Sequence, residues 1–143
     1  MKIYEAKITY NVKSEKPALK LDDPYSIANL MRETFEKNPM QESVWVILLN
    51  HQHICLGKIM IGLGSVCSCV ASIKDILKPA ILASASNIVI CHNHPSGETG
   101  PSQADINLTT KLKKACELVE INLVDHIIVG DGYYSFCDSG LLS

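Results

Sequence analysis

The sequence has no long apolar run, no strong excess of charge of one sign and no closely spaced Cys-x-x-Cys pair. A membrane-spanning helix needs about 20 consecutive apolar residues, and no run here approaches that length. The net charge is −2, and the only tight basic run consists of Lys111, Lys113 and Lys114. Strong unaided binding to duplex DNA needs many phosphate contacts, so the charge pattern argues against that function.

Two further absences narrow the choice of function and compartment. The chain has neither His-x-Glu nor Pro-Cys-x-x-Cys, which excludes the zinc-dependent nucleobase deaminases. Its N-terminus lacks the apolar segment of a secretory signal peptide. Cys55, Cys91 and Cys116 fall within apolar runs, where free cysteine behaves as a small hydrophobe. We therefore expect reduced thiols and a cytoplasmic protein. The pair Cys67 and Cys69 has no clear partners, so we assign it no function.

Length and patterning predict a single α/β domain. The 143 residues, 47% hydrophobic and 20% charged, suffice for one buried core. Strands that alternate with helices indicate α/β layers, with an antiparallel element at the end. The predicted helices cover residues 24–37, 72–85 and 103–120; the predicted strands cover 43–49, 54–63, 88–94, 123–129 and 133–137. Residues 2–13 alternate loosely and predict an additional edge strand.

The most informative segment is His92-x-His94, followed after seven residues by Ser102-x-x-Asp105. Residues two apart in a strand share a face, so both imidazoles can converge at the end of the predicted strand. Asp105 falls in the first turn of the next helix, on the side that carries Leu112. A carboxylate facing the sheet is costly without a cation or a hydrogen-bond donor. Two imidazoles and one carboxylate form a ligand set of catalytic zinc.

Simpler interpretations exist for each part of this segment. Ser102 and Asp105 also match a helix capping box, and either histidine alone is better explained by a structural role. Two histidines on one face, a Gly/Pro loop and an inward acid together favour a metal site. Capping and ligation are compatible, because Ser102 can cap the helix while its hydroxyl faces the site. His51-x-His53 repeats the histidine spacing in a polar turn without a nearby acid pattern, so a second metal site is not favoured.

These residues resemble a known family. The pattern His-x-His-x7-Ser-x2-Asp is that of the JAMM (MPN+/JAB) metalloproteases. The stretch 92–97, the later Pro101-Ser102-x-x-Asp105 and Leu-Val-Asp-His-Ile-Ile-Val-Gly at 123–130 more closely resemble the RadC family. The resemblance covers roughly residues 25–143. It implies a cytidine-deaminase-like fold of α/β/α layers, in which helices flank a mixed β-sheet.

The resemblance also implies roles for individual residues. His92, His94 and Asp105 match the family's zinc ligands, and Ser102 matches the serine that binds the zinc-bound water and the developing oxyanion. Glu42, which precedes an apolar strand, matches the catalytic glutamate. The residues alone would leave Glu98, in the motif loop, as an equal candidate.

The chain departs from the family in two places. Full-length RadC proteins usually carry an N-terminal helix-hairpin-helix region, and the stretch before residue 40 is too short for it. Relatives often have Pro-Arg-Glu after the second strand, where this chain has Val70-Ala71-Ser72-Ile73. The second difference is expected to alter the groove beside the site.

We therefore expect a zinc-dependent hydrolase of amide or isopeptide bonds that acts on a peptide or protein substrate. The alternative is a non-enzymatic module in DNA repair or replication with a structural metal site, and a weaker one is a metal-dependent nuclease. The low basic charge gives little support to DNA association. Asp125 and His126 are interpreted as structural, and Asn93 and Ser96 as residues that shape the loop. A homo-oligomer is compatible with the sequence.

Overall fold

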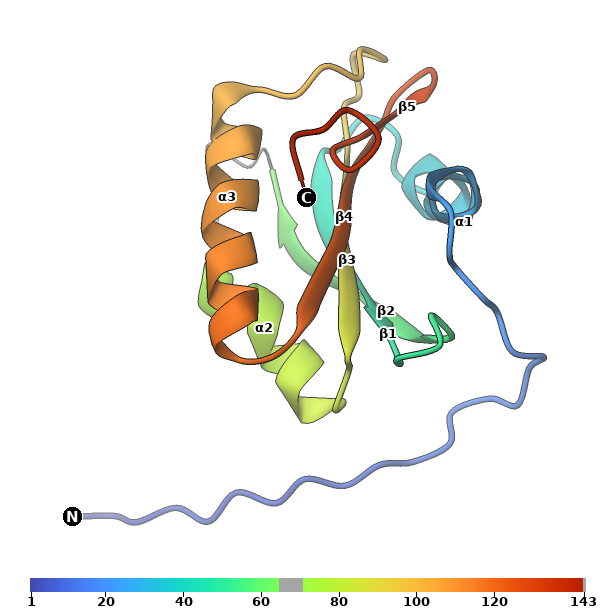
Figure 1. The fold of residues 1–143 in the computed structure, drawn as a ribbon. Helices are drawn as coiled ribbons and strands as arrows, with labels where there is room; N and C mark the ends of the chain where they lie inside the picture. Colours follow the sequence, from blue (N-terminus) through green and yellow to red (C-terminus); the bar gives the residue numbers. More distant parts are fainter. Residues whose placement is uncertain (65–70, 143) are drawn as a thin grey trace.

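A five-stranded sheet lies between helices on its two faces (Figure 1). The computed structural model describes residues 1–64 and 71–142. Within these residues the elements, in chain order, are α1 (Pro24–Glu36), β1 (Ser43–Leu49), β2 (Cys55–Leu63), α2 (Ile73–Leu82), β3 (Asn87–Asn93), α3 (Gln103–Leu118), β4 (Asn122–Val129) and β5 (Tyr133–Ser135). The predicted α/β class, with a mixed sheet flanked by helices, is confirmed.

The sheet has the order β2-β1-β3-β4-β5. Strands β3 and β4 are parallel, and every other neighbouring pair is antiparallel. Since β1 pairs with β3 at Val44 and His92, the segment that enters β1 lies next to the end of β3. This register places Val44 next to His92, although 48 positions separate them in the sequence.

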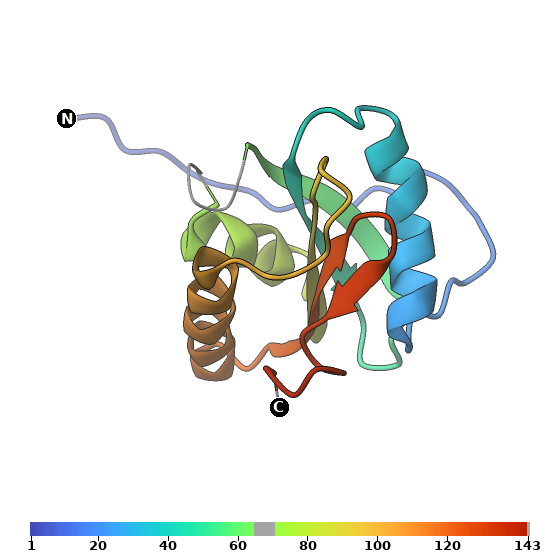
Figure 2. The same cartoon turned by 90° about the horizontal axis from the view of Figure 1, so that it is seen from above.

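Each face of the sheet packs against its own helices. Helices α2 and α3 cover one face and α1 covers the other, as the two perpendicular views show (Figures 1 and 2). Ile88 and Ile90 point into the cluster beneath α2 and α3, whereas Val89 and Cys91 belong to the cluster beneath α1. Strand β3 is therefore buried on both faces, which explains its continuous apolar sequence.

The helix starts follow from local sequence. Asp23 caps α1 by accepting a hydrogen bond from the Ser26 N–H, and Pro24 occupies the first helical position. Ser72 caps α2 and accepts from the Asp75 N–H. Helix α2 begins at Ile73, directly after this cap, and continues through Pro79 to Leu82.

The predicted edge strand over residues 2–13 is wrong. Residues 1–19 form no strand and are exposed, and only Lys20 bridges to Ile54, beside the start of β2. The segment 2–13 carries four charged side chains among its apolar ones. Its alternation is therefore too weak to bury one face, and burial rather than propensity is what stabilises a strand.

The cysteines within the described residues fit the expectation of free thiols. Cys91 and Cys116 are buried in the two core clusters, and Cys55 is half-buried. Burial raises the pKa of Cys116 to about 11, which keeps this thiol protonated and unreactive. Cys67 and Cys69 lie outside the described residues. No helix within residues 1–64 and 71–142 has the length and apolar character needed to cross a membrane.

Candidate metal centre

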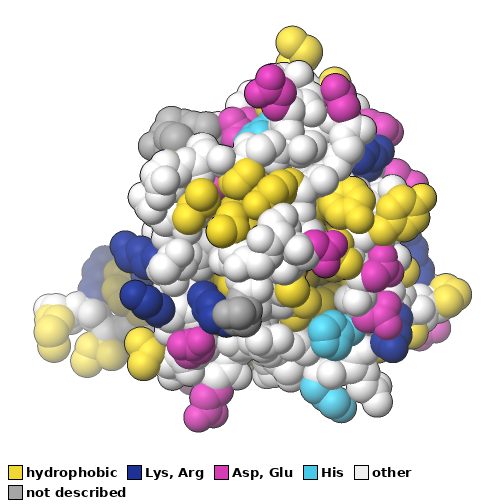
Figure 3. Space-filling view, turned by 45° about the horizontal axis from the view of Figure 1, so that its top comes forward, with side chains coloured by type: hydrophobic (Ala, Val, Ile, Leu, Met, Phe, Trp, Pro, Cys, Tyr) yellow, Lys and Arg dark blue, Asp and Glu magenta, His cyan; other side chains and the backbone are white. Residues whose placement is uncertain are grey.

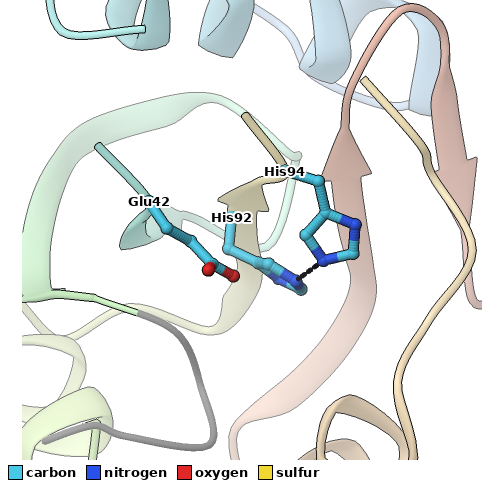
Figure 4. A group of neighbouring side chains, drawn as sticks. All are labelled: Glu42, His92 and His94. Carbon is cyan, nitrogen blue, oxygen red and sulfur yellow. Dashed lines mark hydrogen bonds between the residues drawn. The ribbon is translucent and has the colours of Figure 1, made fainter. Parts of the chain in front are cut away.

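The end of strand β3 brings two imidazoles together. His92 is the penultimate residue of β3 and is fully buried, and His94 follows the strand and is partly exposed. Their Nε2 atoms lie 3.0 Å apart (Figure 4). The predicted convergence of the two side chains is therefore confirmed.

The loop after β3 fixes His94. The His94 N–H donates to the Val129 carbonyl over 2.9 Å, and the His94 Nδ1 lies 2.9 Å from the Glu98 carbonyl oxygen. A carbonyl oxygen only accepts, so His94 carries its proton on Nδ1 and has a lone pair on Nε2. Gly97 has a φ of +89°, and a Cβ there would come within 2.6 Å of the Asp131 carboxylate. Glycine at this position thus allows the tight turn that places the Glu98 carbonyl against the His94 ring.

Asp105 faces both imidazoles from the first turn of α3. Its Oδ1 lies 3.3 Å from the His92 Nε2, and its Oδ2 lies 3.7 Å from the His94 Nε2. The side chain is 2% exposed, which confirms its predicted sheet-facing position. Burial raises the pKa of Asp105, but the neighbouring His92 imidazole and the Ser102 N–H outweigh burial and hold that pKa well below its usual range. Asp105 is therefore a carboxylate at neutral pH.

Glu42 approaches the histidines from the segment that enters β1. One carboxylate oxygen of Glu42 and one nitrogen each of His92 and His94 all lie within 4.8 Å of one another. Figure 4 shows the Glu42 side chain pointing toward His92. Within residues 1–64 and 71–142 these three side chains form the one group with metal-binding spacing. The site thus combines two imidazoles with the carboxylates of Glu42 and Asp105.

A family model described as a RadC-like JAB domain matches residues 21–141. This chain belongs to that family. Curated relatives, each called a UPF0758 protein, include one from Aquifex aeolicus that is 36% identical over 91% of this chain and 56% of the relative. One from Clostridium beijerinckii is 40% identical over 87% of this chain and 54% of the relative. The chain thus spans about half the length of the relatives that it matches.

In this RadC-like domain, Ser102 caps α3. Its hydroxyl oxygen accepts from the Asp105 N–H over 3.1 Å, and the Asp105 Oδ2 accepts from the Ser102 N–H over 2.8 Å. The predicted capping box is therefore confirmed. Because the hydroxyl accepts in this bond, its proton stays available to a ligand. The catalytic role of Ser102 stays a prediction.

Asn93 has a role that the sequence did not reveal. Its side chain turns away from the histidines, accepts from the Ser43 N–H over 2.8 Å and donates to the Gln41 carbonyl over 3.1 Å. Glu42 lies between these two bonded residues, and the Glu42 carbonyl accepts from the Gly64 N–H. Asn93 therefore holds the backbone of Glu42 instead of shaping the motif loop.

His126 on β4 forms a second layer of the site. Its Nε2 lies 2.8 Å from the His92 Nδ1, and its Nδ1 lies 2.6 Å from the Thr109 Oγ. The ring also stacks on Phe136, with centroids 4.6 Å apart. Burial, together with the nearby His92, lowers the pKa of His126 well below its usual range, so the ring is neutral. No spacing rule links His126 to His92, because the contact arises from the pairing of β3 with β4.

Asp125 and the second histidine pair stand apart from the centre. The Asp125 carboxylate accepts from the N–H groups of His126 and Cys137 and from the Ser135 hydroxyl, an arrangement that ties β5 and the following turn to β4. This agrees with the structural interpretation of Asp125. His51 and His53 belong to no metal-binding group within the described residues.

Proposed function

We propose that this RadC-like domain is a zinc-dependent hydrolase of amide or isopeptide bonds. The observation that carries the proposal is the convergence of His92 and His94 with the carboxylates of Asp105 and Glu42. Metal-binding imidazoles without a carboxylate base would suit a structural site equally well. The additional acid is what favours catalysis.

The donor set suits a zinc ion. The His94 Nε2 presents a lone pair to the His92 Nε2 at 3.0 Å, and an anionic, buried Asp105 lies beside both. Imidazole nitrogen and carboxylate oxygen are ligands that zinc accepts readily. We assign His92, His94 and Asp105 as the ligands because Asp105 contacts both Nε2 atoms and matches the family motif, although the group with metal-binding spacing contains Glu42 in place of Asp105. When bound, zinc supplies Lewis acidity that lowers the pKa of a water molecule and polarises a carbonyl group.

Glu42 is assigned as the general base. It is half-buried, its backbone is held on both sides by Asn93, and its carboxylate faces the imidazoles. Glu42 takes a proton from the attacking water and later gives it to the leaving amine. The rival carboxylate, Glu98, is exposed, and its backbone carbonyl is what binds His94.

Ser102 and the neighbouring surface complete the assignment. The Ser102 hydroxyl is exposed at the start of α3, and its free proton can be donated to the oxyanion that develops on the substrate. A cavity of about 150 Å³ borders His94 on the α1 side and is lined in part by Arg32, Phe35 and Asp131. A peptide substrate can place a side chain in this cavity.

The experiment compares substrates for the zinc-loaded protein. It is incubated with a peptide library, with isopeptide-linked peptides and with single- and double-stranded DNA, and a Glu42→Gln preparation serves as the blank. We expect cleavage of peptide or isopeptide bonds by the unsubstituted protein alone. Lysine and arginine side chains are interspersed with acidic ones on the face in Figure 3, and the net charge of the whole chain is −2, so little DNA binding is expected. Cleavage of DNA but not of peptides would overturn the proposal in favour of a nuclease.

A further inference from the structure

Three hydrogen bonds run from His92 into the core, away from the ligand face. They join the His92 Nδ1 to the His126 Nε2 (2.8 Å), the His126 Nδ1 to the Thr109 Oγ (2.6 Å), and the Thr109 Oγ to the Asp105 carbonyl oxygen (2.8 Å). All four residues are at most 2% exposed. The chain therefore begins and ends on candidate ligands, one on β3 and the other on α3.

The carbonyl at the end of this chain sets the direction of every bond in it. A carbonyl oxygen only accepts, so the Thr109 hydroxyl donates its single proton to the Asp105 carbonyl oxygen. The Thr109 oxygen must then accept the proton of the His126 Nδ1. A neutral imidazole has one N–H, which leaves the His126 Nε2 as an acceptor. The proton between the two rings therefore resides on the His92 Nδ1.

This tautomer of His92 is the one that binds a metal ion through Nε2. With Nδ1 protonated, the Nε2 lone pair faces the His94 Nε2 and the Asp105 carboxylate. No proton then lies between the two Nε2 atoms, and their 3.0 Å contact is one that a bound cation stabilises. The opposite tautomer would place a proton where the ion has to bind. Hydrogen bonds behind a histidine ligand commonly fix its tautomer and its orientation.

We propose that His126 and Thr109 are positioning residues that hold His92 in the Nδ1–H tautomer and thereby raise the zinc affinity of the centre. This inference revises the structural interpretation of His126, and it rests on the metal-binding part of the proposed function. The stacking of His126 on Phe136 keeps the ring in place without Thr109. Loss of the Thr109 hydroxyl therefore removes the directing bond and leaves the packing intact.

The chain offers a matched pair of threonines for the test. Thr109 and Thr110 both donate to the carbonyl four residues back in α3, but Thr109 is buried against His126 and Thr110 is exposed. Zinc dissociation constants are measured by competition with a chelator. Thr109→Val is expected to weaken zinc binding about 10- to 100-fold, whereas Thr110→Val and Thr109→Ser retain the original affinity. Unchanged affinity in a folded Thr109→Val protein would overturn the inference.

A second measurement gives its main result in the unsubstituted protein. In the metal-free protein near pH 8, the ¹⁵N chemical shifts of the imidazoles report which nitrogen of His92 is protonated. We expect the proton on Nδ1, and a shift of population toward Nε2–H in Thr109→Val. A His92 proton on Nε2 in the unsubstituted protein would contradict the inference. If the unsubstituted protein does not bind zinc, the proposed function is wrong. Failure of the inference and failure of the proposed function therefore give different results.

Discussion

The side chain of Asn93 brackets Glu42 by binding the backbone on either side of it. It accepts from the Ser43 N–H and donates to the Gln41 carbonyl, and it is 5% exposed. Asn93 also lies between the two histidines in the sequence. The end of β3 thus directs the His92 and His94 side chains toward α3. The residue between them, Asn93, holds the backbone of Glu42, whose carboxylate faces both imidazoles.

Asn93→Ala is expected to separate base positioning from metal binding. The Ser43 N–H is left unpaired in a buried place, which costs about 1–3 kcal/mol of the free energy of unfolding. Displacement of Glu42 lowers the hydrolysis rate about 10²-fold, whereas zinc affinity stays unchanged because no ligand is altered. Urea unfolding, chelator competition and peptide hydrolysis measure the three effects. Asn107→Ala, which alters an exposed asparagine on α3, is the control. Undiminished hydrolysis by Asn93→Ala would refute the positioning role.

Glu42→Gln should keep zinc and lose activity. Glutamine preserves the size of the side chain and removes the proton acceptor, and general-base catalysis typically contributes 10²- to 10⁴-fold. Glu98→Gln is the matched control, because Glu98 is the other acid that the sequence offers near the motif. Metal content and hydrolysis are measured for both variants. Zinc loss in Glu42→Gln would make Glu42 a ligand, and an inactive Glu98→Gln with an active Glu42→Gln would reverse the assignment.

Ser102→Ala is expected to combine the loss of a helix cap with the loss of a catalytic donor. Ser72 caps α2 with the same 3.1 Å bond from the N–H three residues on and also donates to the Asp75 carboxylate, so Ser72→Ala reports the loss of a cap that lies outside the site. Each variant should lower the free energy of unfolding by about 1 kcal/mol. Only Ser102→Ala should also lower the hydrolysis rate, by about 10²-fold. Equal activity of the two variants would leave Ser102 with a capping role only.

Stability of the metal-free protein should fall as the pH drops below 6.5. Burial lowers the pKa of His126 in the folded protein, so only the unfolded chain takes up this proton near pH 6.5. The stabilisation is thus present above pH 6.5 and is lost progressively below it, by up to about 1.4 kcal/mol per pH unit. Urea unfolding between pH 5 and 7 should show a shallower pH dependence for His126→Phe. An identical slope would mean that His126 titrates normally in the folded protein.

Local sequence was enough to predict most elements and the clustering of the His92, His94 and Asp105 side chains. The alternation in β3 placed His92 and His94 on one side, and the Ser102-x-x-Asp105 spacing predicted both the cap and the inward carboxylate, because these features depend on a few adjacent residues. The prediction of a strand over residues 2–13 was wrong because it depended on contacts with distant residues. A strand there would depend on burial of its apolar side chains against the rest of the protein, and these side chains remain exposed.

Contacts between strands were beyond the reach of spacing rules. Glu42 reaches the histidines because β1 pairs antiparallel with β3, and His126 reaches His92 because β4 lies parallel to β3. Strand register depends on the packing of the whole sheet. The family resemblance placed Glu42, but neither it nor the spacing indicated that Asn93 holds Glu42.

The zinc content of the purified protein and its histidine variants tests the central claim most directly. We predict one zinc ion per chain in the unsubstituted protein and in His51→Ala/His53→Ala, which removes the other His-x-His pair. His92→Ala/His94→Ala should remain folded by circular dichroism and contain no zinc. An unsubstituted protein without zinc, or equal zinc in the two double variants, would contradict the account.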